Sequence, residues 1–296
     1  MQVCGRDVHI RGKVIRIGLL EGDRYEPLLD PKGAIEALRT SGTRIDLFTF
    51  MQTPPHTSPQ YDYPMEWDNL AVVPVSTFDQ WWTKQIGNKT RNIVRRAEKN
   101  GVTVREVPFD DALVRGISTI YNEVPTRQGK PFTHYGEDLE TVRRISGTFL
   151  DQSTFIGAFL GETLIGFTKV VSDKAHGQAS LMHILSMVQH RDKAPTNALI
   201  AQAVRSCADR GIPYLVYANF AYGKKQRDSL ADFKEHNGFE RMELPRYYVP
   251  LTLAGRVALR LQLHHGLVNR IPESVQDGLR RIRSVWYGWQ AQQRAA

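Results

Sequence analysis

Residues 183–217, HILSMVQHRDKAPTNALIAQAVRSCADRGIPYLVY, decide the fold. An alternating apolar run ends in a short basic turn, and Pro195 follows where a helix can begin, because the first helical N–H needs no partner. The helix stops near Gly211, and a second apolar run follows. This order predicts a strand, a basic loop, a helix and a further strand, which is typical of an α/β protein.

The basic loop has the composition of an anion-binding site. Its cations, Arg191 and Lys193, stand beside the start of the helix, where unpaired N–H groups and the helix macrodipole favour negative charge. Small residues there let a ligand approach the backbone, and they include Ala194, Thr196 and Asn197. The loop is therefore interpreted either as a diphosphate site or as an ordinary basic strand-to-helix connection.

The composition excludes several protein classes. With 296 residues, 41% hydrophobic and 24% charged, the chain can bury a substantial core. Cys4 and Cys207 are too few for a disulfide framework and have no metal-ligand spacing, so we expect no metal. The N-terminus lacks the apolar core of a secretory signal, and no run approaches the roughly 18 apolar residues of a membrane span. We expect a cytoplasmic protein.

The net charge of +8 indicates polyanionic partners: nucleic acid, anionic lipid or a phosphate-bearing ligand. Seven arginines but only two acidic residues follow Leu251, so much of the excess lies in a basic helical tail. That tail also holds Trp286, Tyr287 and Trp289. These aromatics either pack on the core or place the tail peripherally on an anionic membrane.

A second basic element is predicted as one helix that follows a capping box at Ser76-Thr77 with Gln80 and ends at Gly101. Its cations form either a solvated face or an anion-binding face, and they are Lys84, Lys89, Arg91, Arg95, Arg96 and Lys99.

The remaining pattern divides the chain into three parts. Residues 1–71 predict an incomplete α/β half-domain, with strands near 12–20 and 44–52, a helix at 31–42 and a proline-rich loop at 53–64. Residues 72–250 predict the main domain, in which two alternating runs meet at Gly161-Glu162 as a hairpin. Residues 251–296 form the basic tail.

The order of hairpin, strand, basic loop, helix, strand, short helix and HNGF resembles the GNAT superfamily of N-acetyltransferases. In that superfamily the loop binds the cofactor pyrophosphate and reads Arg or Gln, two residues, Gly, one residue, then Gly or Ala. Here Arg191 is followed by Ala194 and Thr196 at the glycine positions. The variant looks more like the Fem-type branch, on the evidence of APTNAL (194–199), KTRNIVRRAEKNGVTV (89–104) and SLADFKEHNGFE (229–240).

The resemblance implies a fold and a reaction. The fold is a GNAT-like α/β fold, a central mixed sheet with helices on both sides. The reaction moves an acyl or aminoacyl group from acyl-CoA or aminoacyl-tRNA to an amine, with an acceptor on a cell-envelope glycan or precursor as one guess. The negative charge that develops on the carbonyl oxygen during transfer needs a hydrogen-bond donor, and the backbone N–H of Met187 or Val188 is the candidate.

Candidate proton acceptors are Glu123, His134 and Tyr135, which flank a predicted loop, together with His183 and Tyr222. His183 lies on a predicted central strand, where a core histidine is the simpler interpretation. Lys234 stands where many superfamily members have a tyrosine acid, and the Fem-type resemblance implies that it neutralises a phosphate or developing negative charge. Residues 222–227 (YGKKQR) predict a solvated loop or a second phosphate clamp.

Two other classes of function remain open. The chain could be a non-catalytic GNAT-like module that binds RNA through its basic helix, although no RNA-binding motif is present. It could also be a scaffold at an anionic membrane surface.

Overall fold

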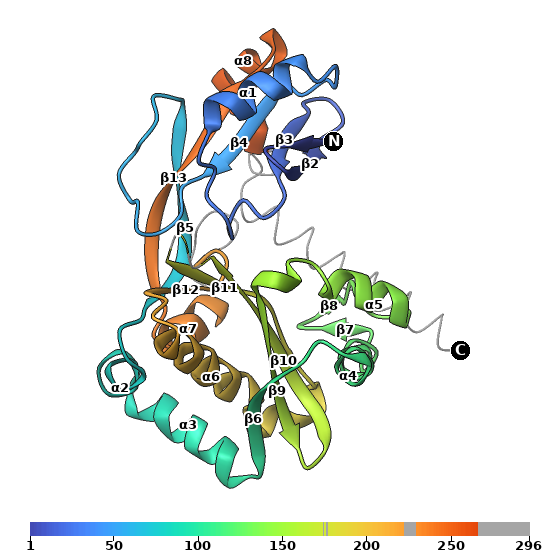
Figure 1. The fold of residues 1–296 in the computed structure, drawn as a ribbon, viewed down its shortest axis with the longest axis vertical. Coiled ribbons are helices and arrows are strands. Elements are labelled where there is room, and N and C mark those ends of the chain that lie inside the picture. The colour runs from blue at the N-terminus through green and yellow to red at the C-terminus, as the bar shows by residue number, and fades with distance from the viewer. Residues whose placement is uncertain (174, 176, 222–228, 266–296) are drawn as a thin grey trace.

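The computed structural model describes residues 1–173, 175, 177–221 and 229–265, and a mixed sheet of eleven strands runs through them (Figure 1). The sheet order is β1-β2-β3-β4-β13-β5-β12-β11-β10-β9-β6. Its strands are β1 (Gln2–Val3), β2 (Arg6–Arg11), β3 (Ile17–Leu20), β4 (Leu47–Met51), β5 (Met65–Pro74), β6 (Val102–Val107), β9 (Ser153–Leu160), β10 (Thr163–Asp173), β11 (Gln178–Ser186), β12 (Tyr214–Val216) and β13 (Glu240–Pro250). A separate small hairpin contains β7 (Thr126–Arg127) and β8 (Lys130–Pro131).

Helices cover both faces of this sheet. They are α1 (Pro31–Thr40), α2 (Phe78–Gln80), α3 (Asn88–Lys99), α4 (Asp111–Tyr121), α5 (Leu139–Ser146), α6 (Pro195–Asp209), α7 (Ser229–His236) and α8 (Leu253–Arg260). Short helical turns are η1 (Trp81–Gln85), η2 (Leu150–Gln152), η4 (Val188–Lys193) and η5 (Leu263–His265). Helices α4 and α6 both contact β10, from opposite sides in Figure 1. The predicted central mixed sheet with helices on both sides is confirmed.

Strand β13 joins the N-terminal strands to the rest of the sheet. It pairs with β5 from Glu240 to Tyr247 and with β4 from Arg246 to Pro250. The predicted boundary between residues 71 and 72 falls inside β5, which also pairs with β12. The hydrophobic core is nonetheless divided: a large cluster lies around α6 and β10, and a smaller one lies between α1, β4 and β13.

The single helix predicted between residues 77 and 101 is wrong. Thr77 caps α2 as expected, with its hydroxyl accepting from the Gln80 N–H at 3.1 Å, but Ile86 and Gly87 are extended and α3 begins anew at Asn88. Arg91 makes the break possible because its guanidinium donates to the carbonyls of Trp82 (2.7 Å) and Ile86 (2.8 Å). Arg91, one of the cations of the predicted basic face, therefore stabilises the fold.

The strands β11 and β12 separate, and this separation creates room for a site. They pair in parallel only at Gln178–Ser180 and Tyr214–Val216, after which β11 continues to Ser186 without a strand neighbour on that side. Helix α6 begins shortly after β11 ends, with Pro195 as its first residue, as predicted.

Candidate functional site

A cavity of about 540 Å³ lies where β11 and β12 separate. This volume is within the range of small-molecule sites. Its wall combines the end of β11, the start of α6, the residue after β12, α7 and the loop between α4 and α5: Arg127, Gln128, Phe132, Ile184, Leu185, Ser186, Arg191, Ala194, Pro195, Thr196, Asn197, Tyr217, Ser229, Leu230 and Phe233. Among these residues there is no group of three metal ligands.

The N-terminus of α6 meets this cavity without a side-chain cap. Ala194 takes the N-cap position with a left-handed φ of 52°, a conformation that glycine adopts more easily. The nearby polar side chains bond elsewhere: Thr196 to the Ser186 hydroxyl at 3.0 Å, and the Asn197 amide to Asn237 at 2.9 Å. No side-chain oxygen caps the first backbone N–H groups of α6, so these donors are suited to bind an anionic ligand.

The two predicted loop cations differ in position. Arg191 lines the cavity, whereas Lys193 lies outside the lining and its Nζ is 3.6 Å from the carboxylate of Asp192. A further cation, Arg127, faces the same cavity from the α4–α5 loop. Burial lowers the pKa of Arg127, and the positive charge of Arg191 adds to this effect, while Glu123 opposes it. The positive charge of Arg191 therefore acts on Arg127, and both guanidinium groups border the same cavity.

Glu123 and Arg127 connect the α4–α5 loop to the end of β11. One Glu123 oxygen accepts the Val188 N–H at 2.7 Å, and the other accepts the Gln189 N–H at 2.9 Å. Arg127 lies 3.2 Å from Glu123 and donates to the Ser186 carbonyl at 2.7 Å. Glu123 therefore holds the turn that carries Arg191, and its carboxylate is fully engaged in that contact.

Replacing Glu123 by alanine should loosen the turn Val188–Lys193. Two backbone N–H groups and a buried guanidinium lose their acceptor, at a cost of about 1–3 kcal/mol. Hydrogen exchange followed by mass spectrometry should show faster exchange there than in the wild type. Glu98→Ala on the exposed surface of α3 is the control, and equal exchange in the two variants would contradict this role.

Both predicted oxyanion donors are hydrogen-bonded in this structure. The Met187 N–H donates to the Ile165 carbonyl at 2.8 Å, and the Val188 N–H donates to Glu123. An acyl oxygen at either position would have to displace that partner, so their role as oxyanion donors stays a prediction.

None of the candidate proton acceptors Glu123, His134, Tyr135 and His183 belongs to the cavity lining. His134 stacks on Tyr121 with ring centroids 4.7 Å apart, and its Nδ1 lies 3.1 Å from Glu137. Tyr135 is 47% exposed. His183 is opposite Lys169 in the β10–β11 pair, and burial, assisted by the charges of Lys169 and His134, lowers its pKa to about 4. His183 is therefore neutral at pH 7.

Lys234 is completely buried behind the cavity wall. Its Nζ donates to the Asn219 carbonyl and lies 4.6 Å from the ring centroid of Tyr217, which does line the cavity. The preceding residue, Phe233, reaches the cavity instead. Tyr222, residues 222–227 and the tail aromatics Trp286, Tyr287 and Trp289 lie outside the described residues.

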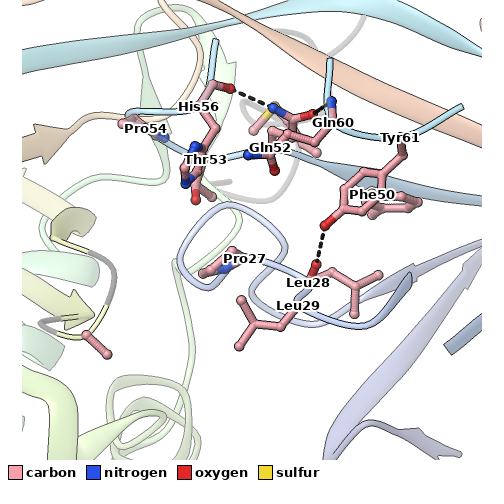
Figure 2. A pocket seen from close by; sticks show the side chains of 12 residues that line it. Pro27, Leu28, Leu29, Phe50, Gln52, Thr53, Pro54, His56, Gln60 and Tyr61 are labelled. Atoms are coloured by element: carbon pink, nitrogen blue, oxygen red, sulfur yellow. Dashed lines mark hydrogen bonds between the residues drawn. The ribbon is translucent and has the colours of Figure 1, made fainter. Parts of the chain in front are cut away.

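A second, smaller cavity of about 280 Å³ lies among residues 27–29, the end of β4 and the loop that follows (Figure 2). Its amide and phenol groups bond within the wall: Gln52 donates to the His56 carbonyl at 2.7 Å, and Tyr61 donates to the Leu28 carbonyl at 3.4 Å. Because this lining contains no arginine or lysine, we place the candidate anion site in the larger cavity.

Comparison with solved structures identifies the fold. FemX aligns with a TM-score of 0.58 at 10% identity, covering 86% of this chain and 86% of that chain. L-PGS from Bacillus licheniformis aligns with a TM-score of 0.56 at 16% identity, covering 89% of this chain and 84% of that chain. The chain therefore has the fold of FemX and of L-PGS.

A third solved structure with this fold is the C-terminal domain of a putative lysylphosphatidylglycerol synthetase from Agrobacterium fabrum. It aligns with a TM-score of 0.52 at 12% identity, covering 86% of this chain and 84% of that chain. No family model matches the sequence, and no curated protein matches it. Within the part of the chain that the structure describes, no helix has the length and apolar character needed to cross a bilayer.

Proposed function

We propose that this Fem-type chain is an N-acyltransferase that binds the phosphates of its acyl donor in the cavity between β11 and β12. The observation that carries the proposal is the start of α6, where a helix without a side-chain cap and Arg191 meet in one cavity. Backbone N–H groups, the macrodipole and a guanidinium all favour a diphosphate. Acyl-CoA is the proposed donor, and aminoacyl-tRNA is the alternative.

The proposed reaction is direct transfer. The amine nitrogen attacks the thioester carbonyl, a C–N bond forms, the C–S bond breaks, and the thiolate of coenzyme A leaves with the electron pair. The amine gives up one proton, and His134 is the proposed acceptor. Its ring lies outside the cavity lining but beside Phe132, which lines the cavity and whose ring centroid is 5.5 Å away, so the amine has to approach from that side. Glu123 acts on this reaction only by holding the loop that carries Arg191.

Replacing both loop cations, Arg191→Ala with Lys193→Ala, should weaken coenzyme A binding about tenfold to a hundredfold. Arg191, the member of the pair that lines the cavity, supplies a charge-assisted contact to phosphate worth roughly 1.5–3 kcal/mol after solvent screening. Calorimetric titration with coenzyme A and acetyl-CoA measures the loss. The matched control removes two exposed lysines of α3, Lys89→Ala with Lys99→Ala, and should bind as the wild type does.

The titration separates the possible donors. Equal affinity in the wild type and the Arg191/Lys193 variant would exclude phosphate binding at this loop. No binding of coenzyme A by the wild type would exclude acyl-CoA as donor, and aminoacyl-tRNA would be titrated next. The acceptor proposed from the Fem-type resemblance is an amine on a cell-envelope glycan or its precursor.

One observation supports the rival role of a non-catalytic RNA-binding module. Helix α3 and the turn before it expose a group of cations with little acidic compensation: Lys84, Lys89, Arg95, Arg96 and Lys99. RNA binding that falls steeply with salt, in a protein without thioester turnover, would favour this role over catalysis.

A further inference from the structure

Three metal-ligand atoms converge at the start of β5, on residues that do not line the cavity between β11 and β12. The Nε2 atoms of His264 and His265 lie 2.9 Å and 3.0 Å from the same oxygen of Glu66. All three atoms lie within 4.8 Å of one another. Glu66 belongs to β5, whereas the two histidines belong to η5, which follows α8.

The spacing of these atoms suits a small divalent cation. Zinc binds imidazole nitrogen and carboxylate oxygen at about 2.0–2.2 Å, so neighbouring ligands of a tetrahedral ion are separated by about 3.3 Å. The two nitrogen–oxygen distances need to open by only a few tenths of an ångström, which small side-chain rotations provide. Two histidines and one carboxylate are also a donor set that zinc uses when a fourth position remains open.

The His264 side chain is buried, whereas the His265 and Glu66 side chains are accessible to solvent. The His264 side chain is only 1% exposed, and its ring lies against Tyr248 with centroids 4.5 Å apart. His265 and Glu66 are 35% and 36% exposed, so an ion can reach them from solvent. His264 also borders a polar cavity of about 440 Å³ that Asp68 and Arg246 line, which leaves room for a water as the fourth ligand.

We propose that Glu66, His264 and His265 bind one zinc-like divalent cation, with water completing a tetrahedral site. The ion fastens the turn η5 to β5, because its ligands come from elements about 200 residues apart in the chain. Without an ion, the same three groups form hydrogen bonds in which a single carboxylate oxygen accepts from two adjacent imidazoles. If the three groups form a zinc site, the affinity for zinc should depend on all three side chains. If they only form hydrogen bonds with one another, it should not.

Calorimetric titration with zinc chloride tests this site in the full-length, tag-free protein after dialysis against EDTA. We expect one zinc per chain with micromolar or tighter affinity, and at least tenfold weaker binding in Glu66→Gln and in His265→Ala. These two residues are chosen because they are partly exposed, so the variants should fold. The controls are His9→Ala and His56→Ala, which remove exposed histidines and should leave the affinity unchanged.

Two further measurements guard against adventitious binding. Zinc should raise the melting temperature of the wild type but not of His265→Ala, since a ligand that binds the folded state stabilises it and the variant lacks one of the three ligands. Cobalt(II) should give the visible absorption of a tetrahedral ion in the wild type and lose it in Glu66→Gln. Absence of zinc binding, or equal binding by the wild type and both site variants, would overturn the proposal whatever the donor titration shows.

Discussion

Arg246→Ala should destabilise the folded chain by about 3–5 kcal/mol, because it leaves two largely buried carboxylates without their cation. Arg246 lies 2.9 Å from Asp23 and 2.8 Å from Asp68, and only 8% of the residue is exposed. Burial alone would lower the pKa of Arg246, but the two carboxylates hold it above its usual value. Urea unfolding at pH 7 measures the loss of stability.

The same strand offers a matched control. Arg241, also in β13, pairs with Glu243 at 2.6 Å, but both side chains are more than one third exposed. Solvent screens this pair, so Arg241→Ala should cost no more than about 0.5–1 kcal/mol. An equal cost for both variants would contradict the importance of burial. Neutralising the group in Arg246→Met with Asp23→Asn and Asp68→Asn should recover much of the stability, since no unpaired charge remains.

The ion pair of Arg246 also makes stability depend on pH. Burial raises the pKa of Asp68, but the charge and hydrogen bonds of Arg246 outweigh this effect and lower the pKa below its usual value. The contribution of Asp68 is therefore present above about pH 4, where the unfolded chain also ionises, and is lost as the pH falls through the lower folded value.

His183 should make the protein lose stability in mild acid. Burial, with Lys169 and His134 nearby, lowers the pKa of its imidazole to about 4 in the folded state, whereas an unfolded histidine has a pKa near 6.5. As the pH falls below 6.5, the unfolded chain binds the proton first. The folded state therefore loses about 2–3 kcal/mol from this group by pH 4.5, and nothing from it above pH 7.

Comparison of His183→Gln with the wild type isolates this effect. Glutamine does not titrate, so the variant should lose about 2–3 kcal/mol less than the wild type between pH 7 and pH 4.5 in urea unfolding. His9→Gln on the exposed face of β2 should follow the wild type. If the pH dependence of His183→Gln also matched that of the wild type, the folded state would not hold His183 neutral.

Local patterns predicted the elements around the cavity between β11 and β12 well. Alternating runs gave the β9–β10 hairpin with Gly161 at a positive φ of 59°, and the missing N–H of proline placed Pro195 at the start of α6. These features depend on neighbours in the chain, so short-range physics determines them. The break between α2 and α3 was not predicted, because it is stabilised by hydrogen bonds from the Arg91 side chain to the Trp82 and Ile86 carbonyls. The sequence pattern had placed Arg91 on a basic surface instead.

The candidate site was predictable only in part. Arg191, Ala194, Thr196 and Asn197 line the cavity because strand, turn and helix are consecutive in sequence. Arg127, Tyr217 and Phe233 also line it, yet the sequence analysis did not select them as site residues. They come from separate segments, and no spacing along the chain indicates that they meet.

The sequence by itself determined the order of strands and helices and the basic turn before α6, because periodicity, proline and glycine act over a few residues. Only the tertiary structure decided what the polar side chains contact. It turned Glu123 toward two backbone N–H groups, buried Lys234 behind Tyr217, and brought Glu66 of β5 to His264 of η5. Such contacts depend on strand pairing between distant residues, which local sequence does not specify.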